Sequence, residues 1–332
     1  MTWFEDLTGF REKNPEQVRQ QMHLDGETLT SQINGRRLIC GRLETPTLAD
    51  LRKRINARAP SSGNLTAREV VADVQALHRD PANAGALFQV ASQFNLLEMT
   101  SPRVTPEQGV GIYEYDHTQG PACAIAAGAG TLYRNYFVPL EGEIGQTVDR
   151  QIDCLADLGA ALGNEEHALW EMRNGYALAS RSGLRQITAR LHAADEDQRD
   201  ALRQRLQIGI QWETQVTLGD VQHLVTQAYC SALPVAYSRH PADLWEPFAR
   251  LVLEAAYEAT LCAAILNCRR TGNRRVYLTL LGGGAFGNRI AWITDSVHHA
   301  LERYAEWDLD IVMVSYGTSK LHVRELVKPF QG

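Results

Sequence analysis

A strand, a glycine-rich loop, a helix and a second strand follow one another near the end of the chain, and they constrain the fold most. Residues 275–281 (RVYLTLL) form an apolar run typical of a strand, and four of the next seven residues, 282–288 (GGGAFGN), are glycines. Apolar residues then recur at helical spacing from Ile290 to Tyr304. Residues 310–316 (DIVMVSY) are apolar on both faces, as in a buried parallel strand. This unit predicts a parallel α/β sheet with a ligand site at the carboxyl ends of its strands.

The glycine-rich loop is suited to holding an anion. Glycines permit positive φ and a close approach of the backbone to a ligand, and the following helix adds N–H donors and a partial positive charge. A phosphate or a diphosphate fits that environment. The loop does not match the P-loop, because no Gly-Lys-Ser/Thr follows it, and this disfavours an NTPase. The alternative is a tight strand-to-helix turn that binds nothing.

The first part of the chain, residues 1–82, is mostly helical by pattern. Leu38–Leu43 is a short β-compatible run. Thr47 precedes the amphipathic segment LADLRKRI and is a suitable N-cap. Thr66 is expected to cap a second helix, whose apolar face would use four residues, Val70, Val71, Val74 and Leu77. We therefore expect a mostly helical N-terminal extension.

Beyond Pro81 the pattern changes to buried strands and helices of small residues. A helix that can pack closely on a sheet is expected from about Pro121. The residues from 147 to 206 are helical and highly charged, which indicates a helical insertion. Strands are expected at residues 86–91, 208–212 and 225–236. The predicted fold class is α/β: a three-layer α/β/α mixed sheet in residues 83–332, with the N-terminal extension and an insert at about 147–206.

Charge and composition exclude several classes of function. The chain has 33 Lys and Arg against 39 Asp and Glu, a net charge of −6, which is unfavourable for nucleic-acid binding. The longest apolar helix candidate, residues 251–266, carries Glu254 and Glu258, as expected for a core helix and not a membrane span. The six cysteines include no CxxC pair, and no carboxylate/His cluster indicates a metal. The N-terminus is polar, without a Sec-type signal, so we expect a cytoplasmic protein, with non-Sec secretion left open.

The C-terminal unit resembles the second ligand loop and the closing βαβ unit of macrodomains, and it looks most like that of poly(ADP-ribose) glycohydrolases, whose loop has the form GxGAFG. In that family the loop clasps the diphosphate of ADP-ribose, and its aromatic residue packs near the distal ribose. The resemblance implies a macrodomain-like fold. It also implies ligand-binding roles for Gly282, Gly283, Gly284, Ala285, Phe286, Gly287 and Asn288.

The first ligand loop of macrodomains follows an earlier strand and contains an Asn that holds the distal ribose. Here ALFQVASQFNLLEM places Gln93 and Asn95 at the corresponding position, and Asp116 and Gln119 precede the segment GPACAIA. The Gln-Glu-Glu signature of poly(ADP-ribose) glycohydrolases is absent. The combination of ASQFN and TQGPACAIA looks instead like divergent macrodomain hydrolases, typified by a Legionella effector that removes ADP-ribose from arginine on ubiquitin. That resemblance implies ADP-ribose and an ADP-ribosylated protein, ubiquitin among them, as partners.

Hydrolysis of an N-glycosidic bond requires a carboxylate that orients or deprotonates water and stabilises oxocarbenium character at C1″. Because polar residues at the end of an apolar strand resemble an active-site rim, we expect Glu213 or Asp220, after the strand IGIQW, to supply it. A solvated surface loop is the alternative for each of the two. Asn95 is the third expected catalytic residue and is expected, with Gln93, to position the distal ribose. The other candidate carboxylates are Glu98, Glu114 and Asp116.

The sequence thus predicts a hydrolase that releases ADP-ribose from mono-ADP-ribosylated protein, with an arginine linkage implied by the resemblance. No cofactor and no metal are expected. Two alternatives stay open: a non-catalytic module that binds ADP-ribose, and an enzyme that uses another nucleotide-sugar. Release of free ADP-ribose from a modified protein distinguishes the first of these alternatives from a hydrolase.

Overall fold

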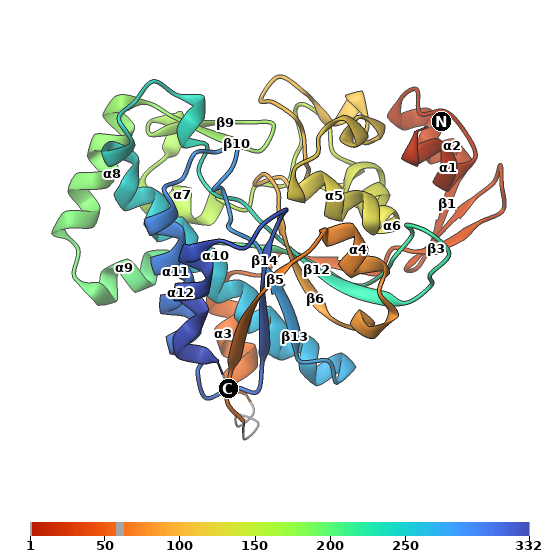
Figure 1. Ribbon diagram of the computed structural model, residues 1–332. Helices are drawn as coiled ribbons and strands as arrows, with labels where there is room; N and C mark the ends of the chain where they lie inside the picture. The colour runs from red at the N-terminus through yellow and green to blue at the C-terminus, as the bar shows by residue number, and fades with distance from the viewer. Residues whose placement is uncertain (1, 58–62, 332) are drawn as a thin grey trace.

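A computed structural model describes residues 2–57 and 63–331 of the chain. Its centre is a seven-stranded sheet with the order β4-β11-β12-β6-β13-β14-β5 (Figure 1). The strands are β4 (Arg42–Glu44), β5 (Thr66–Val71), β6 (Leu87–Ala91), β11 (Gly209–Gln215), β12 (Leu224–Cys230), β13 (Arg275–Leu278) and β14 (Asp310–Ser315).

Strand direction decides which loops can meet. The five strands β12, β6, β13, β14 and β5 are parallel, whereas β11 runs antiparallel to both of its neighbours, β12 and β4. The loops that follow the five parallel strands therefore emerge at one edge of the sheet. The loop that follows β11 emerges at the opposite edge.

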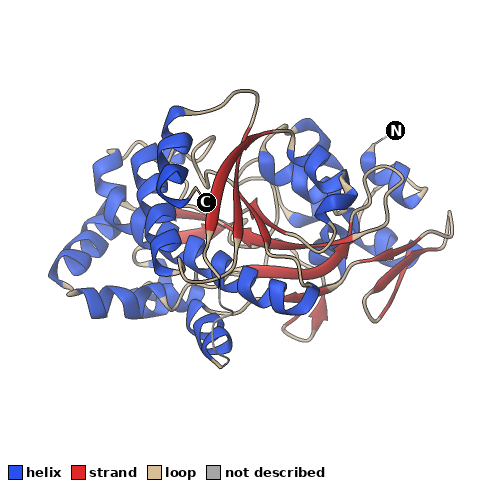
Figure 2. Ribbon diagram, turned by 60° about the horizontal axis from the view of Figure 1, so that its bottom comes forward, coloured by secondary structure: helices blue, strands red, loops and turns tan. Residues whose placement is uncertain are grey.

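Helices cover both faces of the sheet, which gives the three-layer α/β/α mixed architecture that the sequence predicts (Figure 2). One face carries α10 packed against α3, α8, α9 and α11, and α12 packs beside α11 and β5. The other carries α4, α5 and α6. These helices span α3 (Leu48–Asn56), α4 (Val74–Arg79), α5 (Gln119–Ala126), α6 (Gly128–Leu132), α8 (Arg181–Ala193), α9 (Glu196–Arg203), α10 (Ala242–Thr271), α11 (Ile290–Arg303) and α12 (Leu321–Val327).

The N-terminal part differs from the expected helical extension. Residues 2–39 form α1 (Trp3–Thr8), α2 (Pro15–Gln21) and a three-stranded sheet, β1 (Met22–Asp25), β2 (Thr28–Ser31) and β3 (Arg37–Ile39). Their buried apolar side chains form a second hydrophobic cluster together with residues between 97 and 137. Strands β4 and β5 belong to the central sheet instead. The expected boundary at residue 82 therefore falls within the sheet-forming part of the chain.

Two local expectations in this part have opposite outcomes. Thr47 caps α3 as predicted, and its hydroxyl and the Asp50 carboxylate form a capping box. The helix expected from Thr66 was wrong, because residues 66–71 pair with β14 as the parallel edge strand β5. The helix begins only after Asp73, whose carboxylate accepts hydrogen bonds from the first turn of α4.

The insert at 147–206 is helical, but it also contains a hairpin. Helix α7 (Ala156–Leu162) precedes the paired strands β9 (Trp170–Arg173) and β10 (Tyr176–Ala179), and α8 and α9 follow. A second small hairpin, β7 (Pro139–Leu140) and β8 (Glu143–Ile144), lies just before the insert. The β9–β10 hairpin brings Tyr176 from the insert to the edge of the sheet where the parallel strands end.

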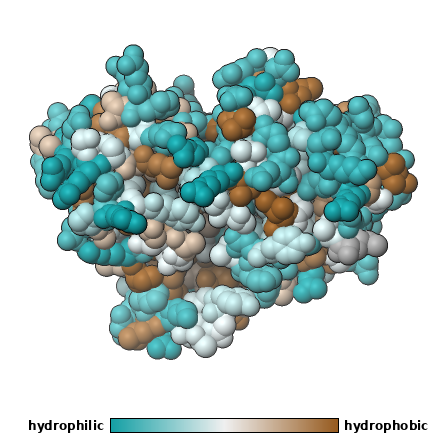
Figure 3. All heavy atoms as spheres, turned by 90° about the horizontal axis from the view of Figure 1, so that it is seen from above, coloured by the Kyte–Doolittle hydropathy of each residue, from teal (hydrophilic) through white to brown (hydrophobic). Residues whose placement is uncertain are grey.

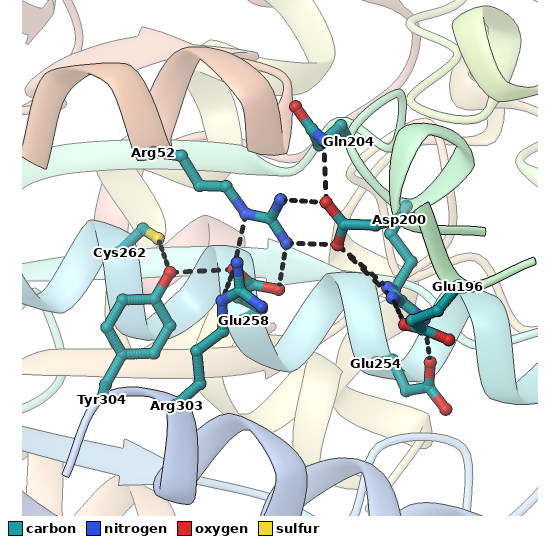
Figure 4. A network of polar contacts seen from close by, with 10 residues as sticks. Arg52, Glu196, Asp200, Gln204, Glu254, Glu258, Cys262, Arg303 and Tyr304 are labelled. Atoms are coloured by element: carbon teal, nitrogen blue, oxygen red, sulfur yellow. Dashed lines mark hydrogen bonds and ion pairs between the residues drawn. The ribbon is translucent and has the colours of Figure 1, made fainter. Parts of the chain in front are cut away.

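Helix α10 forms the centre of one helical layer. It is the one helix in the described ranges long and apolar enough to cross a membrane, but 83% of its most apolar window is buried within the protein. The buried carboxylate of Glu258 on α10 accepts hydrogen bonds from Arg52 at 2.6 and 2.7 Å and from Tyr304 at 2.8 Å, and it forms an ion pair with Arg303 at 2.9 Å (Figure 4). Arg52 also pairs with Asp200 at 2.6 Å. This network ties α3, α9, α10 and α11 together.

Candidate active site

A cavity of about 280 Å³ lies over the carboxyl ends of the parallel strands. It is enclosed by the loop after β6, the start of α5, the segment after β12 and the glycine-rich loop after β13. A wider cavity of about 730 Å³ adjoins it. Figure 3 looks down on this end of the molecule and shows apolar side chains near the middle of a largely polar face. The two cavities share Asp116, Thr118, Gln119, Thr279 and Gly284.

The glycine-rich loop keeps its shape through glycine conformations and one amide. Gly282 and Gly287 have φ of +73° and +71°, and a side chain at Gly282 would collide with Ala232. The Asn288 amide donates to the Leu233 carbonyl at 2.9 Å, which ties the loop to the segment after β12. Asn288 was predicted to bind ligand, but its side chain braces the loop and is buried away from the cavity.

Gly284 lies at the exposed crest of this loop. A Cβ atom placed on it would meet no atom within 4 Å, and the residue lines both cavities. Ala285 and Phe286 follow it along the wall of the smaller cavity. Within the described ranges, no hydrogen bond from the backbone N–H of these three residues to another part of the protein is present. Consecutive free N–H groups in such a turn form a binding site for an anion.

Helix α5 begins on the opposite side of the same cavity. Its N-cap, Thr118, makes no side-chain hydrogen bond to the first turn, so the helix N-terminus stays available toward the cavity. The Gln119 amide instead accepts from the Ala91 N–H at 2.9 Å and donates to the Gln89 carbonyl at 2.8 Å. Gln119 therefore fixes α5 against β6. Asp116 is half-buried at the rim, where it accepts a hydrogen bond from the Thr118 N–H at 2.9 Å.

The two amides of the first loop have different positions. Gln93 lines the cavity, and its side-chain carbonyl accepts a hydrogen bond from the Met99 N–H at 2.8 Å. Asn95 is fully buried and does not line the cavity. Its amide donates to Gln151 at 2.8 Å, and its carbonyl accepts from the Leu97 N–H at 3.1 Å. Asn95 thus organises the loop, whereas Gln93 lies within reach of a ligand.

Glu98 is the buried carboxylate of the cavity. Its side chain is 1% exposed and lines the cavity beside the start of α5. Neither carboxylate oxygen has a hydrogen-bond partner in the part of the chain that the structure describes. The nearest cation is Arg134, whose Nη2 lies 3.9 Å from Oε2. Burial raises the pKa of Glu98 to about 8, Arg134 opposes that rise, and the charge of Asp116 adds to it.

Glu213 and Asp220, the carboxylates expected to act in catalysis, lie elsewhere. Because β11 runs antiparallel, its end and the loop after it are at the edge of the sheet opposite the cavity. Glu213 is partly exposed and pairs with Arg270. Asp220 lines a different cavity, of about 590 Å³, beside Arg36 and Arg37. The structure brings neither residue to the ligand loops.

An aromatic wall that sequence reasoning missed completes the smaller cavity. It consists of Tyr176, Tyr237 and Phe286, whose ring centroids lie 5.1 to 5.6 Å apart. Tyr176 comes from β10 in the insert, and its hydroxyl donates to the Met99 carbonyl at 2.6 Å. Tyr237 comes from the segment after β12. No local sequence pattern connects residues from three separate segments. Of the three aromatic residues, only Phe286 was predicted to bind ligand, because it belongs to the glycine-rich loop motif.

No group of three or more His, Cys, Asp or Glu side chains in the described ranges could hold a metal ion. The chemical groups that converge at the cavity are a buried carboxylate, a half-buried carboxylate, backbone N–H donors and aromatic rings. This combination can hold an anionic group at one end and supply a proton acceptor near the other.

Comparisons with known proteins give structural matches alone. No protein-family model matches the chain, and no curated protein matches it. Among solved structures, it is similar to poly(ADP-ribose) glycohydrolase from Deinococcus radiodurans in complex with ADP-ribose, with 14% identity, 97% and 96% of the two chains covered and a TM-score of 0.43. The enzyme from Thermomonospora curvata shows 14% identity, 94% coverage of both chains and a TM-score of 0.48. The complex of that enzyme with the inhibitor ADP-HPD gives a TM-score of 0.46.

Proposed function

We propose that this chain is a macrodomain-like hydrolase that cleaves an ADP-ribosyl bond and releases ADP-ribose. The observation that carries the proposal is Glu98: a buried carboxylate without a hydrogen-bond partner in the described structure, on the wall of a cavity bounded by the glycine-rich loop. Burying a carboxylate in this way costs free energy, and carboxyl groups with strongly shifted pKa values cluster at functional sites. The resemblance of the loop to those that clasp the diphosphate of ADP-ribose supports the choice of ligand.

In this proposal the diphosphate lies against the N–H groups of Gly284, Ala285 and Phe286, opposite the start of α5. The distal ribose then extends toward Gln93 and the aromatic wall. The ionised form of Glu98 takes a proton from a water molecule while the oxygen of that water molecule attacks C1″. The bond from C1″ to the leaving nitrogen breaks, its electron pair stays on that nitrogen, and the proton is passed on to it.

We further propose that the bond cleaved links ADP-ribose to an arginine side chain. The guanidinium is a planar cation, and aromatic faces and carboxylates are the groups that stabilise it. The cavity offers both, in the aromatic wall and in Asp116 at its rim. A bound guanidinium would also favour the ionised form of Glu98. Arginine-modified ubiquitin is the first substrate to test, beside an unrelated arginine-modified protein.

Thermal unfolding with and without ADP-ribose tests the binding step. A ligand that binds only the native state stabilises it, by about 2.7 kcal/mol at a hundred times its Kd. AMP should stabilise less, because it lacks the second phosphate and the distal ribose. The same samples, given arginine-modified protein, should release ADP-ribose. Binding without release of ADP-ribose from any linkage would show that the chain is a binding module.

Gly284→Val tests the loop. The valine side chain would project into the cavity, so we expect ADP-ribose binding to be lost, with Gly284→Ala intermediate. The fold should tolerate both changes, because a Cβ there meets no atom and the φ of Gly284 is not in the left-handed region. Calorimetry measures the binding, and thermal unfolding checks the fold. Wild-type affinity in a folded Gly284→Val protein would show that this loop does not hold the diphosphate.

A further inference from the structure

Arg134 is a buried cation just behind the cavity. It lies in the π-helical turn η4 (Tyr133–Phe137), directly after α6, and its side chain is 0% exposed. Turns of this kind are rare and are often found at functional sites. Arg134 does not line the cavity, whereas Glu98 does. Among the residues that line the cavity, Glu98 is therefore the one that Arg134 pairs with.

The guanidinium of Arg134 is held on three sides. Its Nε donates to the Leu96 carbonyl at 2.9 Å, and its Nη2 donates to the Thr131 hydroxyl at 3.2 Å. The Tyr229 ring lies under it, with the ring centroid 3.7 Å from Cζ. Nη1 has no hydrogen-bond partner within the described structure. The plane of the guanidinium is thus fixed while part of its hydrogen-bonding capacity stays unused.

The separation between Arg134 and Glu98 has a chemical consequence. At 3.9 Å the two groups attract each other but are too far apart for a hydrogen bond. A direct bidentate pair would occupy the lone pairs of the carboxylate and leave it a weak base. With no cation, a carboxyl buried among apolar groups would stay protonated. The observed distance avoids both extremes and leaves both oxygens of Glu98 open.

We propose that Arg134 is a positioning residue for Glu98, which fixes how the carboxyl faces the cavity and which charge it carries there. This inference rests on the proposed function. The other titratable groups near the carboxyl are Asp116 at the rim, Tyr113 on η3 (Gly111–Tyr115), Tyr229 on β12 and Cys123 on α5. Arg134 is the one cation in this set. Its removal should therefore affect Glu98 in one direction, toward the protonated form.

The test follows Glu98 directly, by NMR of protein labelled with ¹³C at the glutamate carboxyl. The Glu98 resonance is the one lost in Glu98→Gln, and we expect its titration midpoint at about pH 8 in the wild type. In Arg134→Met the midpoint should rise by about 1–3 pH units. The rising limb of kcat/KM against pH should move by the same amount. A wild-type midpoint near the ordinary value of about 4.5 would overturn the inference, as would a midpoint unmoved in Arg134→Met.

Arg134→Lys keeps the test decisive if Arg134→Met does not fold. Lysine keeps the positive charge but loses the planar contacts with Leu96, Thr131 and Tyr229, so the midpoint should stay close to wild type while kcat falls. Unchanged kcat in this variant would overturn the positioning role.

The titration requires no substrate. If wild type neither binds ADP-ribose nor releases it, the proposed function fails whatever the titration shows. If wild type hydrolyses and Arg134→Met keeps its pH profile, only this inference fails.

Discussion

Two buried glutamates in this molecule differ in how they interact with arginine. Glu258 on α10 is 0% exposed and is bonded by Arg52, Arg303 and Tyr304 (Figure 4). Glu98 is 1% exposed, lies 3.9 Å from Arg134 and has no hydrogen-bond partner in the described ranges. The first is what a folded framework requires, because a buried charge is tolerated when its oxygens are satisfied. The second leaves its oxygens free at a cavity. Both carboxylates are buried, so burial does not distinguish them. The number of hydrogen bonds that each carboxylate accepts does distinguish the structural glutamate from the one proposed to act in catalysis.

The largest expected effect is on catalysis, in Glu98→Gln. The amide keeps the size of the side chain but cannot accept a proton from water, so hydrolysis should fall by about 10²–10⁴-fold. Affinity for ADP-ribose should change little, because the diphosphate is held by the glycine-rich loop. Release of ADP-ribose from arginine-modified protein gives the rate, and calorimetry gives the affinity. Turnover near wild type would remove Glu98 from the chemistry and make Asp116 the next candidate.

The matched change, Glu258→Gln, should affect the fold instead. It removes the buried counter-charge that the Arg52 and Arg303 guanidiniums share, although Arg52 keeps its pair with Asp200, and breaking a buried pair costs up to about 3–5 kcal/mol. Denaturant unfolding measures this loss. Hydrolysis per folded molecule should stay near wild type, since the network lies among α3, α9, α10 and α11. Equal losses of stability and activity in both glutamine variants would erase the distinction between the two glutamates.

A smaller effect concerns pH. The pKa of Glu98 is raised by folding, so the native state holds a proton that the unfolded chain releases from about pH 4.5 upward. The stability that comes from this proton is complete below that pH and is lost as pH rises to about 8. Unfolding free energies of wild type and Glu98→Gln should therefore diverge across this range, with wild type losing more. Parallel curves would show that Glu98 titrates normally.

The smallest effects are expected in Glu213→Gln and Asp220→Asn. Neither side chain lines the cavity: Glu213 is partly exposed, and Asp220 lines a different cavity. Stability should change by at most about 0.5 kcal/mol, and hydrolysis should stay close to wild type. These variants are the controls for Glu98→Gln, since each also replaces a carboxylate with its amide. A large loss of turnover in either would restore the assignment made from the strand pattern.

Local sequence patterns predicted the elements that depend on local physics. The strand, glycine-rich loop, helix and strand predicted at 275–316 are confirmed: the two strands are β13 and β14, and the helix is α11. The cap at Thr47 is also confirmed. The helix expected from Thr66 was wrong because the valine pair at 70–71 joins a sheet whose partner strand, β14, lies far along the chain. Helical spacing and β-branched residues conflicted there, and tertiary pairing decided the outcome.

The site was harder to predict because it depends on strand direction. A strand pattern does not reveal whether β11 runs parallel or antiparallel to its neighbours, yet that choice moves Glu213 and Asp220 from one edge of the sheet to the other. Glu98 was named as a candidate, but its distinguishing feature is its relation to Arg134, a residue on a different element. Several residues predicted to bind ligand do line the cavity: Gln93, Asp116, Gly282, Gly284, Ala285 and Phe286.

The position of β4 and β5 has a practical consequence. They are the two outer strands of the central sheet, and both come from the first 71 residues of the chain. A shortened protein that began at residue 83 would leave the main-chain N–H and C=O groups of β11 and β14 unpaired along two open edges. Such edges are templates for intermolecular pairing, so the shortened chain should aggregate instead of folding as an isolated catalytic unit.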